Sequence, residues 1–215
     1  AATISKFLDD KEFNEIAIFY RTNNQSRLFE EELRKLGIDY KVVGNVGFYD
    51  RKEIKDVIAY LTYLVNPEEI LSFERILNVP KRGIGESTLQ KLRDYANENK
   101  ISVSRSIEKL DVMNNLSDRI KGQINNFCEI IDDLKSFAIQ GPSTTISKIL
   151  ELTGYKDELI REGTLESQMR LENLDELLTS AFEFENLYDE EIDDPFSLLR
   201  DYLDSISLFT DADNV

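Results

Sequence analysis

Apolar residues recur at every third or fourth position along most of the chain beyond residue 50, which places them on one face of an α-helix. The pattern is clearest over residues 116–138. It recurs over about 101–110, 143–163, 165–187 and 195–208. No convincing alternation of apolar and polar residues, which would indicate a strand, follows residue 50. We therefore predict a mainly α fold for this part of the chain.

The first 46 residues have a different pattern. Residues 15–20 form an apolar run typical of a strand buried on both faces, residues 28–36 have helical spacing, and residues 39–43 return as a second strand. This order predicts a small βαβ piece. Ligands gather at the carboxyl ends of parallel strands, so Arg21 and Asn23, which follow the first strand, are candidate binding residues. An ordinary solvated loop is the alternative.

A glycine-bearing turn over residues 78–85 separates two further helical patterns, at about 70–77 and 89–96. Glycines allow a tight turn and close approach of the backbone, and the helix that follows presents unpaired N–H groups to an anion. The turn therefore predicts a phosphate cradle of the helix-hairpin-helix kind. An ordinary corner between two helices is the alternative, since short motifs often match by chance. The candidate groups are Lys81, Arg82, the backbone of Gly83, Ile84 and Gly85, and the Thr88 hydroxyl.

Composition excludes several kinds of chemistry. The 215 residues include no histidine and one cysteine, Cys128, so an intramolecular disulfide, a cysteine metal cluster and histidine-based catalysis are excluded. The sequence has no Gly-x-x-x-x-Gly-Lys-Ser/Thr phosphate loop, and we expect no metal or cofactor site in this chain. No run approaches the roughly 18 apolar residues that a membrane helix needs. An autonomous enzyme and a membrane protein are therefore disfavoured.

The net charge of −16 argues against general affinity for nucleic acid, but it is unevenly distributed. Residues 1–100 hold 16 basic and 17 acidic residues, whereas residues 101–215 hold 10 and 25. The nearly neutral first half is therefore compatible with a locally basic surface that binds DNA.

Four segments together resemble a known family. The strings IFYRTNNQSR (residues 18–27), FYDRKEIKD (48–56), NVPKRGIG (78–85) and RLENLDEL (170–177) resemble, in order and spacing, the UvrD/PcrA/Rep group of superfamily-1 DNA helicases. The resemblance covers nearly the whole chain. It implies that residues 1–46 are part of the second RecA-like motor domain and that residues 47–215 are its helical insertion.

The resemblance also implies roles for individual residues. Arg21 and Asn23 match family residues that hold the translocating single strand. Lys55, Thr88 and the Gly83-Ile84-Gly85 backbone match residues that contact duplex phosphates ahead of the fork. The parent protein is then expected to be a cytoplasmic, ATP- and Mg²⁺-dependent 3′–5′ DNA helicase of repair or replication. This chain alone lacks the ATPase motifs and is expected to be inactive.

The expected partners are a junction of single-stranded and duplex DNA, the rest of the helicase, and repair or replication proteins. The long amphipathic helices and the acidic charge also fit a second hypothesis, an all-helical protein-interaction module without DNA binding of its own.

Overall fold

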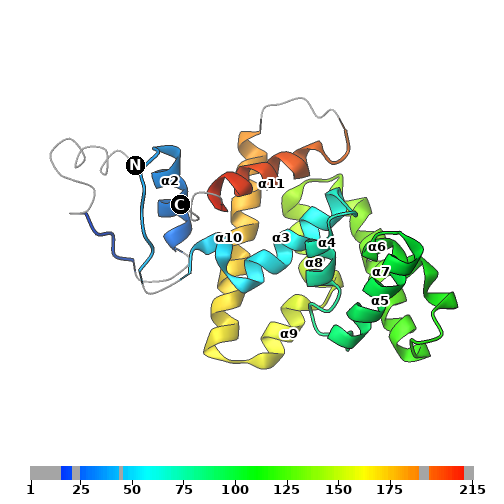
Figure 1. Ribbon diagram of the computed structural model, residues 1–215. Coiled ribbons are helices and arrows are strands. Elements are labelled where there is room, and N and C mark those ends of the chain that lie inside the picture. The colour runs from blue at the N-terminus through cyan, green and yellow to red at the C-terminus, as the bar shows by residue number, and fades with distance from the viewer. Residues whose placement is uncertain (1–15, 21–24, 44–45, 189–193, 211–215) are drawn as a thin grey trace. The chain divides into compact units, whose positions relative to one another are not determined.

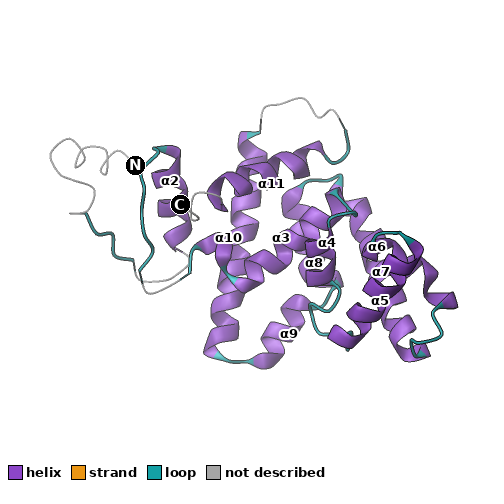
Figure 2. Cartoon of the chain, in the orientation of Figure 1, coloured by secondary structure: helices purple, strands orange, loops and turns teal. Residues whose placement is uncertain are grey.

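The computed structural model describes residues 16–20, 25–43, 46–188 and 194–210, with side chains described only as far as residue 207 at the end of the last helix. The described secondary structure is helical throughout (Figure 2), as the apolar periodicity predicts. The chain divides into two compact units. The smaller comprises residues 1–51 and 206–215, and the larger comprises residues 52–205.

The smaller unit contains the helix α2 (Ser26–Lys35) and the 3₁₀ turn η3 (Phe48–Asp50). The buried Glu30 carboxylate accepts the backbone N–H of Phe48 at 3.2 and 3.3 Å, which joins these two elements. The buried guanidinium of Arg51 donates to Ser26 Oγ at 2.9 Å. The start of α2 and the end of η3 are therefore joined by buried polar contacts.

The predicted βαβ piece is not found among the described residues. Residues 16–20 and 38–43 carry no strand, whereas the helix between them forms as predicted. A strand needs hydrogen bonds from a neighbouring strand and cover for its apolar side chains. Phe19 is 93% exposed and Val43 is 84% exposed, so neither segment is covered in the way that a buried strand requires.

The larger unit is built around α3 (Lys52–Val65), shown in cyan in Figure 1. It packs against the helices α4 (Ile70–Ile76), α7 (Asp118–Ala138), α8 (Pro142–Leu152) and α10 (Leu165–Leu187). Among the residues of α3 only Lys52 is exposed, as expected for a helix in the middle of a bundle. The side chains of α3 with almost no exposed surface are Ile54, Val57, Tyr60, Leu61 and Leu64.

The remaining helices extend or close this bundle. α5 (Glu86–Asn99) follows α4, and it packs against the short α6 (Val103–Ser106), which leads into the 3₁₀ segment η4 (Ile107–Val112). α9 (Tyr155–Glu162) packs against α8 and α10, and α11 (Ser197–Thr210) begins in the larger unit. None of the helices in the described part of the chain has both the length and the apolar character needed to cross a membrane.

Two predicted helices are interrupted. The single helix expected over residues 143–163 is divided into α8 and α9, because Gly154 adopts a left-handed conformation with φ +74°. The segment near residues 101–110 becomes α6 and η4, with a kink at Lys109. Both interruptions lie within continuous apolar patterns. Periodicity alone therefore does not reveal them.

Helix starts follow local capping chemistry. Ser117 Oγ accepts the N–H of Ile120 at the start of α7, and Thr164 and Ser167 form a reciprocal capping box at the start of α10. Pro142 occupies the first turn of α8, where its missing N–H costs nothing. These caps explain why the predicted boundaries at 116 and 165 lie close to those observed.

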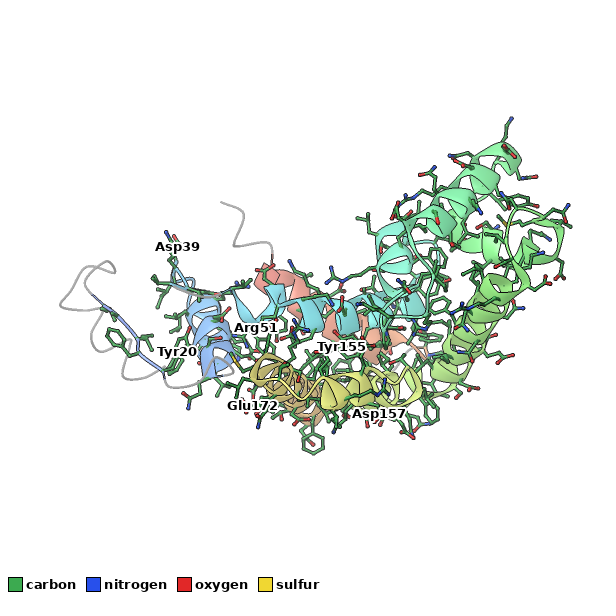
Figure 3. All side chains as sticks on the ribbon, turned by 90° about the horizontal axis from the view of Figure 1, so that it is seen from below. Tyr20, Asp39, Arg51, Tyr155, Asp157 and Glu172 are labelled. Carbon is green, nitrogen blue, oxygen red and sulfur yellow. The ribbon has the colours of Figure 1, made fainter. Side chains whose placement is uncertain are left out.

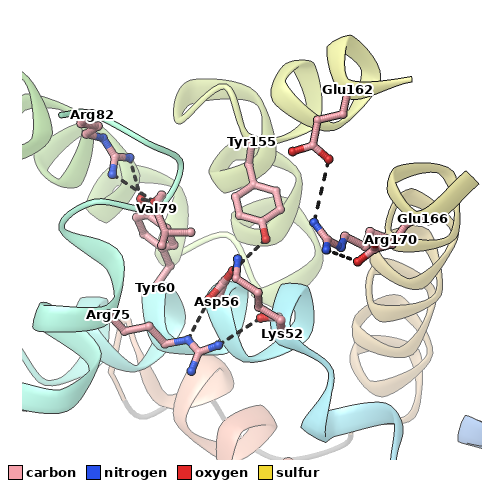
Figure 4. Close-up of polar contacts among 10 residues, drawn as sticks. All are labelled: Lys52, Asp56, Tyr60, Arg75, Val79, Arg82, Tyr155, Glu162, Glu166 and Arg170. Atoms are coloured by element: carbon pink, nitrogen blue, oxygen red, sulfur yellow. Dashed lines mark hydrogen bonds and ion pairs between the residues drawn. The ribbon is translucent and has the colours of Figure 1, made fainter. Parts of the chain in front are cut away.

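A buried carboxylate on α3, that of Asp56, joins three helices of the larger unit (Figure 4). It accepts from Arg75 Nε at 2.8 Å on α4, from the Tyr155 hydroxyl at 2.8 Å on α9, and from Lys52 Nζ at 3.1 Å on α3 itself. A buried charge is tolerated when it is paired and hydrogen-bonded, as here. Burial, followed by the nearby Asp56 carboxylate, raises the pKa of Tyr155, so its hydroxyl remains a donor.

One turn away on the same helix, the buried Glu53 carboxylate accepts from Asn173 Nδ2 of α10 at 2.6 Å. This contact joins two of the strings that carry the family resemblance, 48–56 and 170–177, across 120 positions of the sequence. Glu53 therefore joins α3 to α10.

The exposed faces of α9 and α10 carry acidic side chains such as Asp157 and Glu172 (Figure 3).

Replacing Tyr155 by phenylalanine tests the Asp56 network. We expect Tyr155→Phe to lower the free energy of unfolding by about 1.5–3 kcal/mol, because it removes a hydrogen bond to a buried charged group. The measurement is urea unfolding followed by circular dichroism. The matched control is Tyr95→Phe, whose hydroxyl makes no hydrogen bond within the described residues and whose loss should change stability by less than about 0.5 kcal/mol. Equal effects of the two substitutions would contradict the assigned role of Tyr155.

Two glycines provide a second test. Gly141, at the start of α8, has φ +118°, and a Cβ there would lie 2.6 Å from Glu185 Oε1, which accepts the N–H of Ser143 at 2.7 Å. We expect Gly141→Ala to destabilise the chain by about 1–3 kcal/mol. Gly122 lies exposed within α7 with open space around it, so Gly122→Ala should stabilise by about 0.5–1 kcal/mol. Thermal unfolding measures both, and a stabilising Gly141→Ala would refute the expected strain.

Candidate nucleic-acid interface

The turn predicted to bind phosphate connects α4 to α5 in the larger unit. α4 ends at Ile76, and α5 begins at Glu86 with Gly85 in the N-cap position. Gly83 has φ +75°, a conformation that other residues rarely adopt, with nothing within 4 Å of the position that a Cβ would occupy. Glycine is thus required at residue 83 for backbone conformation. Classification of the turn as a helix-hairpin-helix motif stays a prediction.

The Asn78 side chain shapes the turn from within. Its Oδ1 atom accepts the backbone N–H of Arg82 at 2.8 Å and that of Ile84 at 3.1 Å. Asn side chains often hold turns in this way, by bonding to nearby backbone. Ile84 is only 3% exposed, so it anchors the turn in the core as the sequence predicts.

The backbone N–H groups of Gly83, Gly85, Glu86 and Ser87, all exposed residues of the turn and of the first turn of α5, have no hydrogen-bond acceptor within the described residues. The next N–H, that of Thr88, donates to the Gly85 carbonyl at 2.9 Å. Unpaired N–H groups at a helix start, together with the positive end of the helix dipole, favour an anion. The turn thus has unpaired N–H groups of the kind that the predicted cradle requires, and phosphate binding there stays a prediction.

The side chains predicted to assist this cradle have different surroundings. Lys81 is exposed beside the turn. The Thr88 side chain is only 7% exposed, so its hydroxyl is less accessible than the sequence suggests. The Arg82 guanidinium points inward, toward Val79 and Tyr60 (Figure 4). Lys81 is therefore the exposed cation of this turn, and Arg82 is part of its internal structure.

An arginine clamp joins the two helices that flank the turn. Arg93 on α5 binds Glu74 on α4 through two parallel hydrogen bonds of 2.7 Å, and it also donates to Glu86 at 2.7 Å. Hydrogen bonds from Arg93 to Glu74 and then to Glu86 raise the pKa of the guanidinium. The clamp partly neutralises Glu86, whose carboxylate at the helix start would otherwise repel a phosphate.

The structure does not bring Lys55 to this turn. Lys55 is half-buried on α3, five residues before Tyr60, which contacts Arg82. Five residues turn an α-helix by about 140°, so Lys55 and Tyr60 lie on different faces of α3. Arg21 and Asn23 lie outside the described residues. Their predicted contact with a single strand stays a prediction.

Sequence reasoning missed two residues that support the turn: Asn78 within it and Tyr60 on α3. Asn78 carried a usable signal, because asparagine near glycine is typical of turns. Tyr60 carried none, because it lies 22 positions before Arg82 and meets it only through tertiary packing.

A nucleotide or metal site has no matching residues in the described part of the chain. No group of three or more acidic, histidine or cysteine side chains there is arranged to hold a metal ion. The whole sequence also lacks the glycine-lysine phosphate loop of P-loop NTPases. The described residues therefore do not fit ATP with Mg²⁺.

The described residues form a helical module in which one turn exposes unpaired backbone N–H groups, a kind of group that can bind phosphate without reading base sequence. Comparison with known proteins gives the family: a family model, the UvrD-like helicase C-terminal domain, matches residues 1–214. The chain belongs to this family, which confirms the resemblance read from the four strings.

Relatives include proteins named ATP-dependent DNA helicase PcrA. The chain is 38% identical over 206 residues to the one from Bacillus subtilis and 40% identical over 205 residues to the one from Staphylococcus epidermidis. The one from Staphylococcus aureus is 39% identical over 205 residues. These matches cover 94–95% of this chain and 27% of each relative. The chain thus spans about a quarter of the length of these relatives.

Proposed function

We propose that this chain is a DNA-binding part of an ATP-dependent 3′–5′ DNA helicase that acts in repair or replication. The turn at Gly83-Ile84-Gly85 binds phosphates of the duplex ahead of the fork, and the segment with Arg21 and Asn23 contacts the translocating single strand. Family membership and the printed names of the relatives support the activity of the parent protein.

The observation that carries the proposal is the set of exposed N–H groups at Gly83, Gly85, Glu86 and Ser87. Groups of this kind bind phosphate oxygens whatever the base sequence, so they position a duplex without reading it. Lys81 adds one cationic contact beside them. The turn lies in the nearly neutral first hundred residues and not in the acidic second half.

The parent protein is proposed to bind ATP and Mg²⁺ through residues other than those described for this chain. In this arrangement residues 1–46 belong to the second motor domain, and residues 47–215 form its helical insertion. Lys55 is proposed as a further duplex contact from α3, on a different face from Tyr60. The chain itself holds phosphates and carries out no chemical step.

A second candidate function is protein interaction. Leu165 is 82% exposed and Leu187 is 84% exposed, at the two ends of α10, and α10 carries six acidic residues against one basic residue. Two leucines at opposite ends of a 23-residue helix do not form one apolar patch, so the acidic charge of α10 is the observation that favours a basic protein partner. Capture of a basic protein partner by a chain that does not bind DNA would favour this second function over DNA binding.

The test is fluorescence anisotropy of the purified chain with a labelled DNA hairpin that carries a 3′ single-stranded tail, at several salt concentrations. We expect binding that weakens with salt and does not depend on the duplex sequence. Lys81→Met should lower the slope of log K against log salt by about 0.9, the value for one lost phosphate contact. Lys156→Met, an exposed lysine on α9, is the matched control and should leave the slope unchanged.

Two results would contradict the proposal. One is the absence of binding at low salt, which would favour the interaction function. The other is an equal effect of Lys81→Met and Lys156→Met, because the contact would then be nonspecific attraction to any surface lysine.

A further inference from the structure

We propose that Arg82 is a positioning residue, which holds the turn in its phosphate-binding conformation from inside and does not itself contact phosphate. This inference rests on the proposed DNA-binding function. It assigns the contact with phosphate to the backbone N–H groups and to Lys81, although the adjacent Lys81 and Arg82 look equivalent in the sequence.

The hydrogen bonds of the Arg82 guanidinium carry the argument. Nη1 donates to the carbonyl oxygens of Ile76 at 2.9 Å and Val79 at 3.0 Å, with those of Leu77 and Pro80 at 3.3 and 3.4 Å. These carbonyls belong to the end of α4 and the start of the turn, where helix geometry leaves acceptors without donors. Arg82 thus adds a charged donor to carbonyls of which that of Ile76 also accepts a backbone N–H, from Val79 at 3.1 Å.

The Tyr60 hydroxyl connects this cluster to the central helix. It accepts from Arg82 Nη2 at 2.6 Å and donates to the Val79 carbonyl at 2.5 Å. Tyr60 is completely buried, and burial raises its pKa to about 12, with Arg82 opposing that shift. The hydroxyl is therefore protonated at neutral pH and able to donate and accept at once.

Packing fixes the guanidinium further. Its central carbon lies 5.3 Å from the centre of the Phe127 ring on α7, a cation–π arrangement. Lysine lacks the planar guanidinium group, so it cannot make several hydrogen bonds in fixed directions and also stack on an aromatic ring.

A phosphate contact by Arg82 would require the side chain to leave these partners. The Ile76 and Val79 carbonyls would then each lose one of their donors, keeping the Val79 N–H and the Tyr60 hydroxyl respectively, and the Tyr60 oxygen would lose the group that donates to it. Loss of hydrogen bonds from a charged donor within this half-buried cluster is costly. Asn78 would remain as the main internal support of the turn, through the N–H groups of Arg82 and Ile84. The inward position of Arg82 is thus the one in which the turn keeps its shape.

The test compares Arg82→Lys, Arg82→Met and Tyr60→Phe with Lys81→Arg, in the hairpin anisotropy assay at fixed salt. A positioning role predicts that Arg82→Lys weakens binding as much as Arg82→Met, roughly tenfold, the scale of one lost charge-assisted hydrogen bond. Tyr60→Phe should weaken binding in the same direction and combine with Arg82→Met non-additively. Lys81→Arg should retain affinity, because a phosphate contact needs only the charge.

Arg82→Lys that retains wild-type affinity while Arg82→Met loses it would overturn the proposal, because charge alone would then suffice. Additive effects of Arg82→Met and Tyr60→Phe would overturn it as well. If Arg82→Met does not fold, Tyr60→Phe and Arg82→Lys still separate the two roles.

Amide hydrogen exchange of the chain without DNA tests the positioning role of Arg82 separately from DNA binding. We expect Arg82→Lys to accelerate exchange at the N–H groups of residues 82 and 84, which bond to Asn78, and not at those of α8. Unchanged exchange at residues 82 and 84 would refute the positioning role even if the wild-type chain binds DNA. Accelerated exchange in a chain that does not bind DNA would refute only the proposed function.

Discussion

The buried carboxylate of Asp56 is the interaction on which the arrangement of the larger unit depends. Removing a carboxylate from water is unfavourable unless its oxygens are paired and hydrogen-bonded. Asp56 obtains its partners from α3 itself, from α4 through Arg75 and from α9 through Tyr155. Glu53 adds Asn173 from α10. Apolar packing brings these helices together, and the carboxylates restrict how they can slide along α3, because any shift would leave a buried charge unpaired.

The candidate site depends on the same central helix. α3 carries Asp56 and Tyr60 one turn apart, so the helix that holds α4 and α9 also presents the hydroxyl that meets Arg82. Arg93 joins α4 to α5 on the other side of the turn. The exposed N–H groups at the start of α5 are thus supported by side chains from two helices. A phosphate site made of backbone N–H groups needs such support, because rotation of a side chain cannot reorient these donors.

Much of the helical architecture was predictable, because helix formation depends on local periodicity and capping. The helices α7 and α10 follow the predicted ranges closely, and each begins with a side-chain cap, at Ser117 and Thr164. The division between α8 and α9 was not, because Gly154 adopts φ +74° inside an apolar pattern that continues on both sides. The expected strands at 15–20 and 39–43 are not found among the described residues, because a strand depends on neighbours that its own sequence does not specify.

The sequence by itself determined that the chain is mainly helical, that a glycine turn separates two helices near residue 83, and that the chain resembles UvrD-like helicases. Those properties follow from spacing, from residue types and from matched strings, all of which can be read along the sequence without knowledge of tertiary contacts. Only the tertiary structure decided that Lys81 faces outward while Arg82 faces Tyr60 and Phe127, and that Glu53 and Asp56 pair with residues about a hundred positions away. The physical reason is that the direction of a charged side chain depends on which acceptors lie within its reach, and these acceptors come from distant parts of the chain.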